Sequence, residues 1–234
     1  MSRIRRRPRI ELPTLNPIDQ LRAGRLVRRI PQLYAGLFLF GWSMAMMIKA
    51  DLGLPPWDVL HQGLTHYWPI SFGAVTIIVG AVVLLLWVPL RQWPGLGTVS
   101  NVFVVGVAVD IGIWALPTPH GMAARIALLL AGVILNGLAG AVYIGSAFGA
   151  GPRDGLMTGL VQRTGLSVRV IRTGIELAVL GVGFLLGGTV GVGTVLYAVG
   201  IGPLVQLFLP YVLVRGLIGR TSASAPREAD PVPG

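Results

Sequence analysis

The chain has 234 residues, of which 53% are hydrophobic and 12% charged, with a mean hydropathy of +0.74 and 33 glycines. Soluble domains carry about 25% charged residues, so this composition excludes a soluble globular protein. The net charge of +10 is concentrated at one end, because nine arginines against Glu11 and Asp19 give residues 1–29 a net charge of +7. A nucleic-acid binder carries its basic residues on a folded face, so we expect no nucleic-acid partner.

Residue types that many enzymes and metal sites require are missing from the sequence. There is no cysteine, which excludes disulfides, thiolate nucleophiles and cysteine-bound metals. The three histidines, His61, His66 and His120, have no metal-binding spacing, and no Ser/His, Cys/His or HExxH arrangement of a hydrolase is present. We therefore expect no enzymatic activity, no metal and no other cofactor.

Six stretches are apolar enough, over the roughly 20 residues that cross a bilayer, to be membrane-spanning helices. A basic tail at 1–30 precedes them, and a Ser/Pro/Ala-rich tail at 214–234 follows and is expected to be disordered. Two polar, Gly/Pro-containing connectors, 50–69 and 146–166, each begin with a turn signal and continue as a short helix. The predicted spans are 31–50, 70–90, 97–116, 125–147, 167–187 and 193–213.

Arginine and lysine near the span ends predict the orientation, since cytoplasmic loops carry an excess of them. With both termini in the cytoplasm, only Lys49 and Arg125 fall on the other side. The basic tail is also expected to contact anionic lipid head groups, at about 1 kcal/mol per residue near the surface. The residues that this orientation places on the cytoplasmic side are Arg22, Arg25, Arg28, Arg29, Arg91, Arg153, Arg163, Arg169, Arg215 and Arg220.

The sequence matches itself at a shift of 96 residues, with 16 identities over the 58 positions from 53 to 110. Polar residues are among the matches: Asp58 aligns with Asp154 and Ser71 with Ser167. Each half, 31–120 and 121–213, contains three spans. Because three is an odd number, the second half starts on the opposite side of the membrane and has the inverted orientation. We therefore predict a 3+3 inverted repeat, an architecture typical of transporters, whose sites lie where Gly/Pro interrupts corresponding segments.

The two connectors hold the first candidate site residues. Pro56 and Pro152 are predicted to occupy first helical positions, which places Trp57 and Arg153 second and Asp58 and Asp154 third. One interpretation is structural, since an acid in the first turn complements the helix dipole. The other is that both helix starts contact a solute: Arg153 would bind an anion, Trp57 would stack on it, and neighbouring glycines would serve as hinges that let the backbone approach. These glycines are Gly53, Gly149 and Gly151.

Further candidates lie within and beside the spans. Arg172 and Glu176 have the i,i+4 spacing of a helical pair, and Glu176 falls near mid-membrane, where a charge pairs or lines a pathway. Asp110 has no cation on its own predicted helix and is either a proton or cation site or a hydrogen-bonded structural acid. His61 lies three residues after Asp58, on the same helical face, where it could tune a proton-linked step.

The chain resembles the YczE/YyaS/YitT group of bacterial integral membrane proteins over residues 31–212. The segments that carry this resemblance are Gly53-Leu-Pro-Pro-Trp-Asp-Val-Leu-His61, Gly149-Ala-Gly-Pro-Arg-Asp-Gly-Leu-Met157, Arg163-Thr-Gly and Gly191-Val-Gly-Thr194. The resemblance implies a multi-pass protein of the bacterial inner membrane. Members of the group have been proposed to transport vitamin B6 vitamers, so it implies these vitamers, or another small anion, as the candidate solute.

Two functions therefore remain open from the sequence. The first is a small-solute transporter or permease, whose substrate pathway contains the charged residues above. The second is a regulatory or scaffold membrane protein that acts through its basic tail. The glycine-rich spans also permit two copies to associate as a homodimer.

Overall fold

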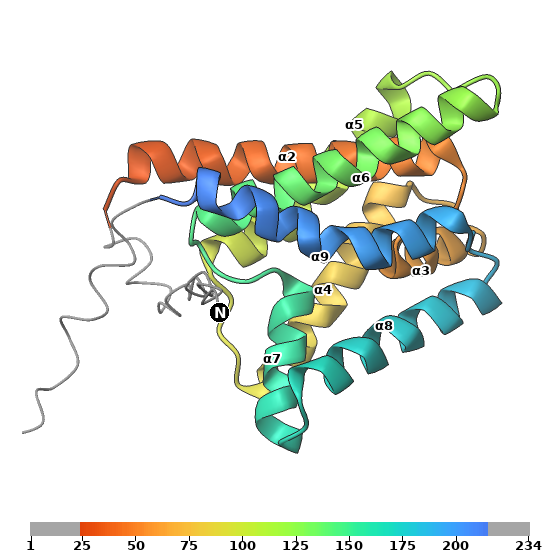
Figure 1. The fold of residues 1–234 in the computed structure, drawn as a ribbon. Coiled ribbons are helices and arrows are strands. Elements are labelled where there is room, and N and C mark those ends of the chain that lie inside the picture. Colours follow the sequence, from red (N-terminus) through yellow and green to blue (C-terminus); the bar gives the residue numbers. More distant parts are fainter. Residues whose placement is uncertain (1–23, 215–234) are drawn as a thin grey trace, which may run out of the picture.

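The computed structural model describes residues 24–214 and confirms an all-α protein over that range. Each of the six predicted spans and both predicted connector helices corresponds to a helix (Figure 1). Most of the basic tail, and the C-terminal tail with Arg215 and Arg220, lie outside the described residues. Within 24–214 the helices are α2 (Leu26–Ala50), α3 (Pro56–Thr65), α4 (Phe72–Leu90), α5 (Leu96–Ala115), α6 (Met122–Gly145), α7 (Pro152–Thr164), α8 (Val168–Leu185) and α9 (Val192–Val212).

Five of these helices, α2, α4, α5, α6 and α9, are long and apolar enough to cross a membrane. Their outward faces carry large exposed apolar side chains, such as Leu85 on α4 and Trp114 on α5, at 68% and 86% exposure. Contiguous apolar surface of this kind needs a lipid environment. Helix α8 matches the predicted span at 167–187 but carries three charges, Arg169, Arg172 and Glu176.

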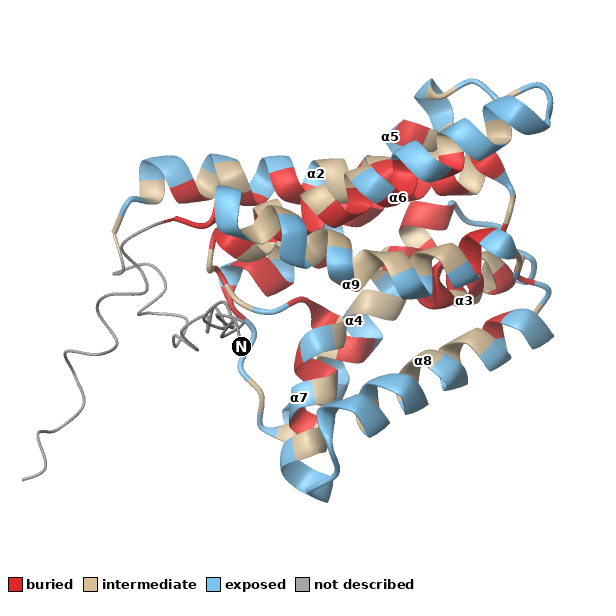
Figure 2. Cartoon of the chain, in the orientation of Figure 1, coloured by how far each residue is buried: buried red, intermediate tan, exposed pale blue. Residues whose placement is uncertain are grey.

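The most extensive packing joins α2 to α6, with α5 against α2 and α9 against α6 (Figures 1 and 2). Glycines permit this approach: a Cβ at Gly36 would lie 2.7 Å from the backbone nitrogen of Tyr143, and one at Gly41 would lie 2.5 Å from the carbonyl oxygen of Val105. Lipid provides no hydrophobic driving force between helices. Small residues at helix contacts let the backbones approach closely, and the resulting van der Waals packing stabilises the helix pair. The α2–α6 pair therefore forms the central support of the bundle.

The short helices α3 and α7 pack across the two halves of the chain. Helix α3 packs on α8, and α7 packs on α4. Gly63 of α3 faces Leu186 beyond the end of α8, and Gly159 of α7 faces Leu90 at the end of α4, where added Cβ atoms would come within 2.7 and 2.9 Å of the leucine Cβ atoms. The aligned residues of the two halves thus make reciprocal contacts.

Helix boundaries follow the 96-residue shift of the sequence. Four pairs of helices start 96 residues apart, and the turns before α3 and α7 contain Gly53 at φ +105° and Gly149 at φ +108°. Ser71 caps α4 through the amide of Ala74, and Ser167 caps α8 in the same way. The paired helix starts are Leu26 and Met122, Pro56 and Pro152, Phe72 and Val168, and Leu96 and Val192.

Two arginines, also 96 residues apart, tie α2 and α6 together at opposite ends. Arg29 Nε donates to the carbonyl oxygen of Ser146, and Arg125 Nε donates to that of Ala50, both at 2.8 Å. Arg125 also pairs with Asp51 Oδ2 at 2.7 Å. A cation that satisfies the last carbonyl groups of a helix stabilises its C-terminus. Each half therefore caps the corresponding helix of the other half.

Candidate functional site

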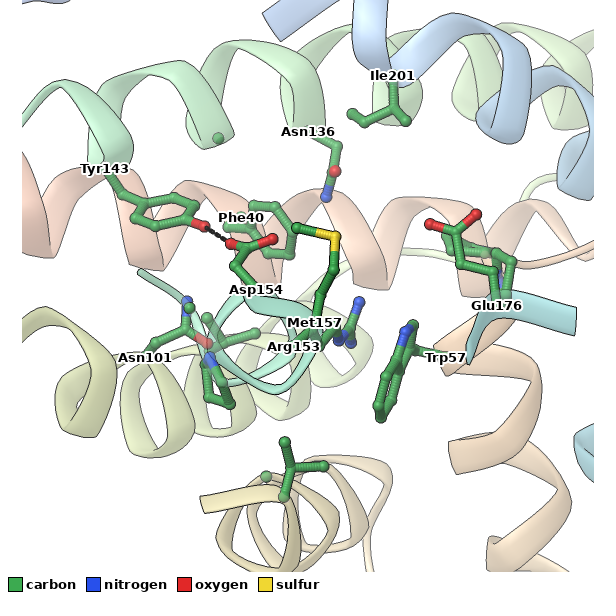
Figure 3. A pocket seen from close by; sticks show the side chains of 18 of the residues that line it. Phe40, Trp57, Asn101, Asn136, Tyr143, Arg153, Asp154, Met157, Glu176 and Ile201 are labelled. Carbon is green, nitrogen blue, oxygen red and sulfur yellow. Dashed lines mark hydrogen bonds between the residues drawn. The ribbon is translucent and has the colours of Figure 1, made fainter. Parts of the chain in front are cut away.

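A cavity of about 370 Å³ lies between the two halves, at the starts of α3 and α7 (Figure 3). All eight described helices contribute to its lining. A volume of this size accommodates a small organic solute. Its polar and aromatic lining residues are Phe40, Trp57, His61, Thr76, Asn101, Asn136, Tyr143, Arg153, Asp154, Arg172, Glu176, Tyr197 and Gln206.

The connector helices begin as the sequence predicts. Pro56 and Pro152 are the first residues of α3 and α7, where a missing amide hydrogen costs no helical hydrogen bond. The indole Nε1 of Trp87 on α4 donates to the carbonyl oxygen of Pro152 at 3.0 Å, which fixes the start of α7 against the first half. Both helix starts line the cavity.

Asp58 lies behind the cavity wall and is 2% exposed. Its Oδ1 atom makes no hydrogen bond but lies 3.4 Å from His61 Nδ1 and 3.8 Å from Arg153 Nη2. His61 Nδ1 is also 3.4 Å from the hydroxyl of Thr76. The carboxylate of Asp58 is thus held by two basic groups that line the cavity, and the structure brings Asp58, His61 and Arg153 together.

Arg153 bridges this buried acid and an aromatic wall. Its guanidinium carbon lies 4.9 Å from the ring centroid of Trp57, a distance typical of a cation–π contact. The Arg153 side chain is 34% exposed and makes no hydrogen bond to another described residue, so donors remain for a solute. Trp57 and Arg153, which align at the 96-residue shift of the sequence, therefore form one surface.

The side chain of Asp154 has different surroundings from that of Asp58, although the two residues align. Its side chain is exposed to the cavity and points toward Tyr143, whereas Arg153 points toward Trp57 (Figure 3). The hydroxyl of Tyr143 donates to Asp154 Oδ2 at 3.5 Å, at the limit of hydrogen bonding. Among the described residues, no cation forms a salt bridge with the Asp154 carboxylate.

The predicted Arg172–Glu176 pair is present on α8. Arg172 Nε donates to Glu176 Oε1 at 3.2 Å, and both side chains line the cavity with more than a third of their surface exposed. Within residues 24–214, no three His, Cys, Asp or Glu side chains gather in a way that could hold a metal ion.

Sequence reasoning missed a polar bridge across the cavity wall. The hydroxyl of Tyr197 on α9 donates to Asn136 Oδ1 at 3.1 Å, and Asn136 Nδ2 donates to the hydroxyl of Ser43 on α2 at 2.8 Å. A buried asparagine in an apolar span is the sequence signal that could have found it, since polar residues there need partners.

Asp110 lies outside the cavity lining. Its carboxylate accepts hydrogen bonds from the hydroxyl of Ser71 at 2.5 Å and from the amide of Gly73 at 2.7 Å. These bonds tie the start of α4 to α5, so the structural alternative for Asp110 accounts for its contacts. The predicted hinge glycines Gly53 and Gly149 lie in the turns before α3 and α7, and of the three predicted hinge glycines only Gly151 is part of the lining.

The cavity lining divides by half of the chain. At five aligned positions the first half contributes apolar, aromatic or small polar groups where the second half contributes charged or polar groups, whereas His61 of the first half aligns with the apolar Met157. All four charged side chains in the lining come from the second half. The five pairs that differ in this way are Phe40 and Asn136, Trp57 and Arg153, Thr76 and Arg172, Gly80 and Glu176, and Asn101 and Tyr197.

Comparisons with known proteins place the chain among bacterial sequences without an assigned activity. The model of a family of unknown function, DUF6198, matches residues 27–210. An uncharacterised protein of Haemophilus influenzae is 39% identical over 78% of this chain and 84% of its own length. The uncharacterised membrane protein YczE of Bacillus subtilis is 33% identical over 79% and 87%, and YyaS of the same organism is 23% identical over 76% and 90%. No solved structure matches the chain.

Proposed function

The chain belongs to the DUF6198 family of membrane proteins, and we propose that this member transports a small polar solute through the cavity between its two halves. The observation that carries the proposal is a charged cavity enclosed by helices that have apolar outer faces. Charged groups inside a membrane protein are costly to bury and mark substrate or ion pathways. The cavity also lies at Gly/Pro-interrupted helix starts, as transporter sites do.

The proposed topology has six spans, with α8 as the sixth, arranged as an inverted repeat of α2–α5 and α6–α9. Support comes from the four helix starts that share one 96-residue spacing and from the reciprocal caps made by Arg29 and Arg125. The charges of α8 are compatible with a span because Arg172 and Glu176 pair and face the cavity. Helices α3 and α7 would then enter the membrane from opposite sides.

The different packing of two aligned helices supports alternating access as the proposed mechanism. Helix α4 packs closely on α5, whereas α8 makes almost no contact with α9. The hydrogen bonds of Asp110 hold α4 in place, while the residue aligned with Asp110 is Gln206, which lines the cavity. In a second conformation of the protein, α8 would pack on α9 as α4 packs on α5 in the structure. Helix α4 would then move away from α5. The solute site would then face the other side of the membrane.

Arg153 and Trp57 are the proposed anchor for an anionic, planar part of the solute. Arg153 presents free donors beside an indole ring, and a pyridine ring with a phosphate or phenolate group would fit this combination. Vitamin B6 vitamers are therefore candidate solutes, together with other small ring compounds.

The proposed location is the bacterial inner membrane, with both termini in the cytoplasm. This orientation puts the nine arginines of residues 1–29 on the side of the anionic leaflet, where all but the buried Arg29 would contact lipid head groups. Two copies would be free to associate through the lipid-facing helices, and no catalytic step is part of the proposal.

A chain without cysteine allows a direct test, because a single introduced cysteine reports on one position. We expect Met157→Cys, in the cavity lining, to react with a membrane-impermeant thiol reagent. A transported compound should slow this reaction and should also exchange across liposomes that contain the purified protein. Vitamins, amino acids and nucleobases, with the B6 vitamers among them, form the panel.

The matched control is His120→Cys, which lies in an exposed loop outside the cavity and should react at the same rate with or without the compound. If compounds that protect Met157→Cys never cross the liposome membrane, the protein binds solutes without transporting them, and the proposed function is wrong.

A further inference from the structure

The charged side chains in and beside the cavity include more carboxylates than guanidinium groups. Two guanidinium groups, Arg153 and Arg172, face three carboxylates, Asp58, Asp154 and Glu176. Burial of His61 beside Asp58 disfavours a charged imidazole. Arg172 pairs with Glu176 at 3.2 Å, and Arg153 lies 3.8 Å from Asp58. The carboxylate that is left is Asp154, the one that is exposed to the cavity.

The direct hydrogen-bond partners of Asp154 are neutral, and Arg153 and Arg172 act on its charge from a longer range, without a salt bridge. The Tyr143 hydroxyl, at 3.5 Å, and the amide of Gly151 face the carboxylate, and neither carries a full positive charge. An ionised carboxylate inside a membrane protein needs a cationic partner or several strong donors. A solute with a positive group would complete this site.

A purely anionic solute fits the same cavity poorly. It would bring a second negative charge into the space that Asp154 already occupies, where charges interact strongly because water is scarce. Arg153 nevertheless keeps free donors on the other side of the cavity, beside Trp57. The cavity thus presents an anion-binding group and a cation-binding group at adjacent residues whose side chains point in different directions (Figure 3).

On the basis of the proposed transport function, we infer that the solute is a ring compound carrying both charges, with a protonated amine or ring nitrogen at Asp154 and an acidic group at Arg153. The ring lies among aromatic walls, since Trp57, Phe40, Tyr143 and Tyr197 all line the cavity. Asp58 acts behind Arg153, where it positions the guanidinium rather than contacting the solute.

Four compounds with one ring and different charges test this inference: 4-(aminomethyl)benzoate, benzoate, benzylamine and benzyl alcohol. Thermal unfolding of the full-length protein in detergent, with each compound in a concentration series, gives its apparent affinity. We expect 4-(aminomethyl)benzoate to raise Tm at concentrations about tenfold lower than benzoate does, because a charge-assisted bond is added at Asp154.

The variants assign each charge to a residue. Asp154→Asn should bind 4-(aminomethyl)benzoate no better than benzoate, and Arg153→Gln should bind it no better than benzylamine. Asp51→Asn is the matched control, because Asp51 is an exposed acid outside the cavity, and it should keep the full preference for the zwitterion.

Two results would overturn the inference. If benzoate binds as well as 4-(aminomethyl)benzoate and Asp154→Asn changes neither, the site recognises anions, and the transport proposal stands without the zwitterion. If none of the four compounds shifts Tm, the inference is wrong, and the transport proposal depends on the solute panel tested with Met157→Cys and liposomes.

Discussion

The two halves of the molecule share their helix starts, turns and caps but differ in how tightly they close. In the first half, α4 is capped by Ser71, held by Asp110 on α5 and packed along its length. In the second half, α8 has the same serine cap but only one buried residue, Gly183, and it separates from α9 (Figure 2). The two aligned halves thus differ in packing, with α4 close to α5 and α8 apart from α9.

The same contrast separates the two aspartates. Asp58 and Asp154 occupy the same position at the starts of α3 and α7, yet one is buried beside two basic groups and the other is exposed to the cavity. Under the proposed alternating access, each half would adopt both environments in turn, so this difference between Asp58 and Asp154 is the one that the proposal expects.

Substitution of these acids should have the largest effect. We expect Asp58→Asn or Asp154→Asn to reduce solute exchange in liposomes by about tenfold or more, because each removes a charge that binds or positions a solute group. Asp51→Asn should retain exchange. The amount of folded protein in the membrane, measured on the same samples, separates this loss from misfolding. Retained transport in the double variant of Asp58 and Asp154 would rule out their role.

The second largest effect is expected from the two arginine caps. Substitution of Arg29 and of Arg125 should lower the stability of the protein by different amounts, because the two side chains have different surroundings. Arg29 is fully buried, whereas the Arg125 side chain is 29% exposed and its partner Asp51 is 62% exposed. We expect Arg29→Met to lower the free energy of unfolding by about 2–4 kcal/mol, since it leaves buried carbonyl groups without donors. Arg125→Met should cost about 1 kcal/mol or less. Unfolding in detergent measures both, and equal losses would contradict this distinction between the caps.

The serine caps provide a smaller comparison. Ser71→Ala should lower stability by about 1–2 kcal/mol, because Ser71 both caps α4 and donates to Asp110. Ser167→Ala should lower it by only about 0.5–1 kcal/mol, since Ser167 caps α8 without such a partner. Thermal unfolding of the two variants side by side checks the order, and a reversed order would show that α8 is held by contacts comparable to those of α4.

The smallest effect is expected from the basic tail. Removal of residues 1–20 should leave solute exchange in liposomes within about twofold of the full chain, because the cavity is built from helices that begin at Leu26. A scaffold that acts through this tail would instead lose its cellular role upon the same deletion while the helical bundle remained folded.

Local structure was accessible from the sequence because short-range rules determine it. Pro56 and Pro152 predicted the helix starts, the i,i+4 spacing predicted the Arg172–Glu176 pair, and apolar stretches predicted the long helices. The partners of Asp110 were not predictable, because Ser71 and Gly73 lie far away in the sequence.

The unequal environments of the aligned residues could not be predicted either. The 96-residue shift assigns Asp58 and Asp154, or α4 and α8, the same local structure, and only tertiary packing separates them. The shift could have identified the Arg29 and Arg125 caps, since these arginines align, but their acceptors are backbone carbonyl groups, which leave no residue signature.

The most direct test of alternating access is a disulfide between α8 and α9. In the closed half, a Cβ at Gly106 would lie 2.5 Å from Ile77 Cγ1, and the aligned positions are Thr173 and Gly202, where nothing lies within 4 Å of an added Cβ at Gly202. The account predicts that Thr173→Cys/Gly202→Cys forms a disulfide in membranes and stops transport until it is reduced. The pair Ile77→Cys/Gly106→Cys should cross-link as well and trap the opposite state. Failure of the 173–202 pair to form a disulfide during active transport would contradict the exchange of open and closed packing between the halves.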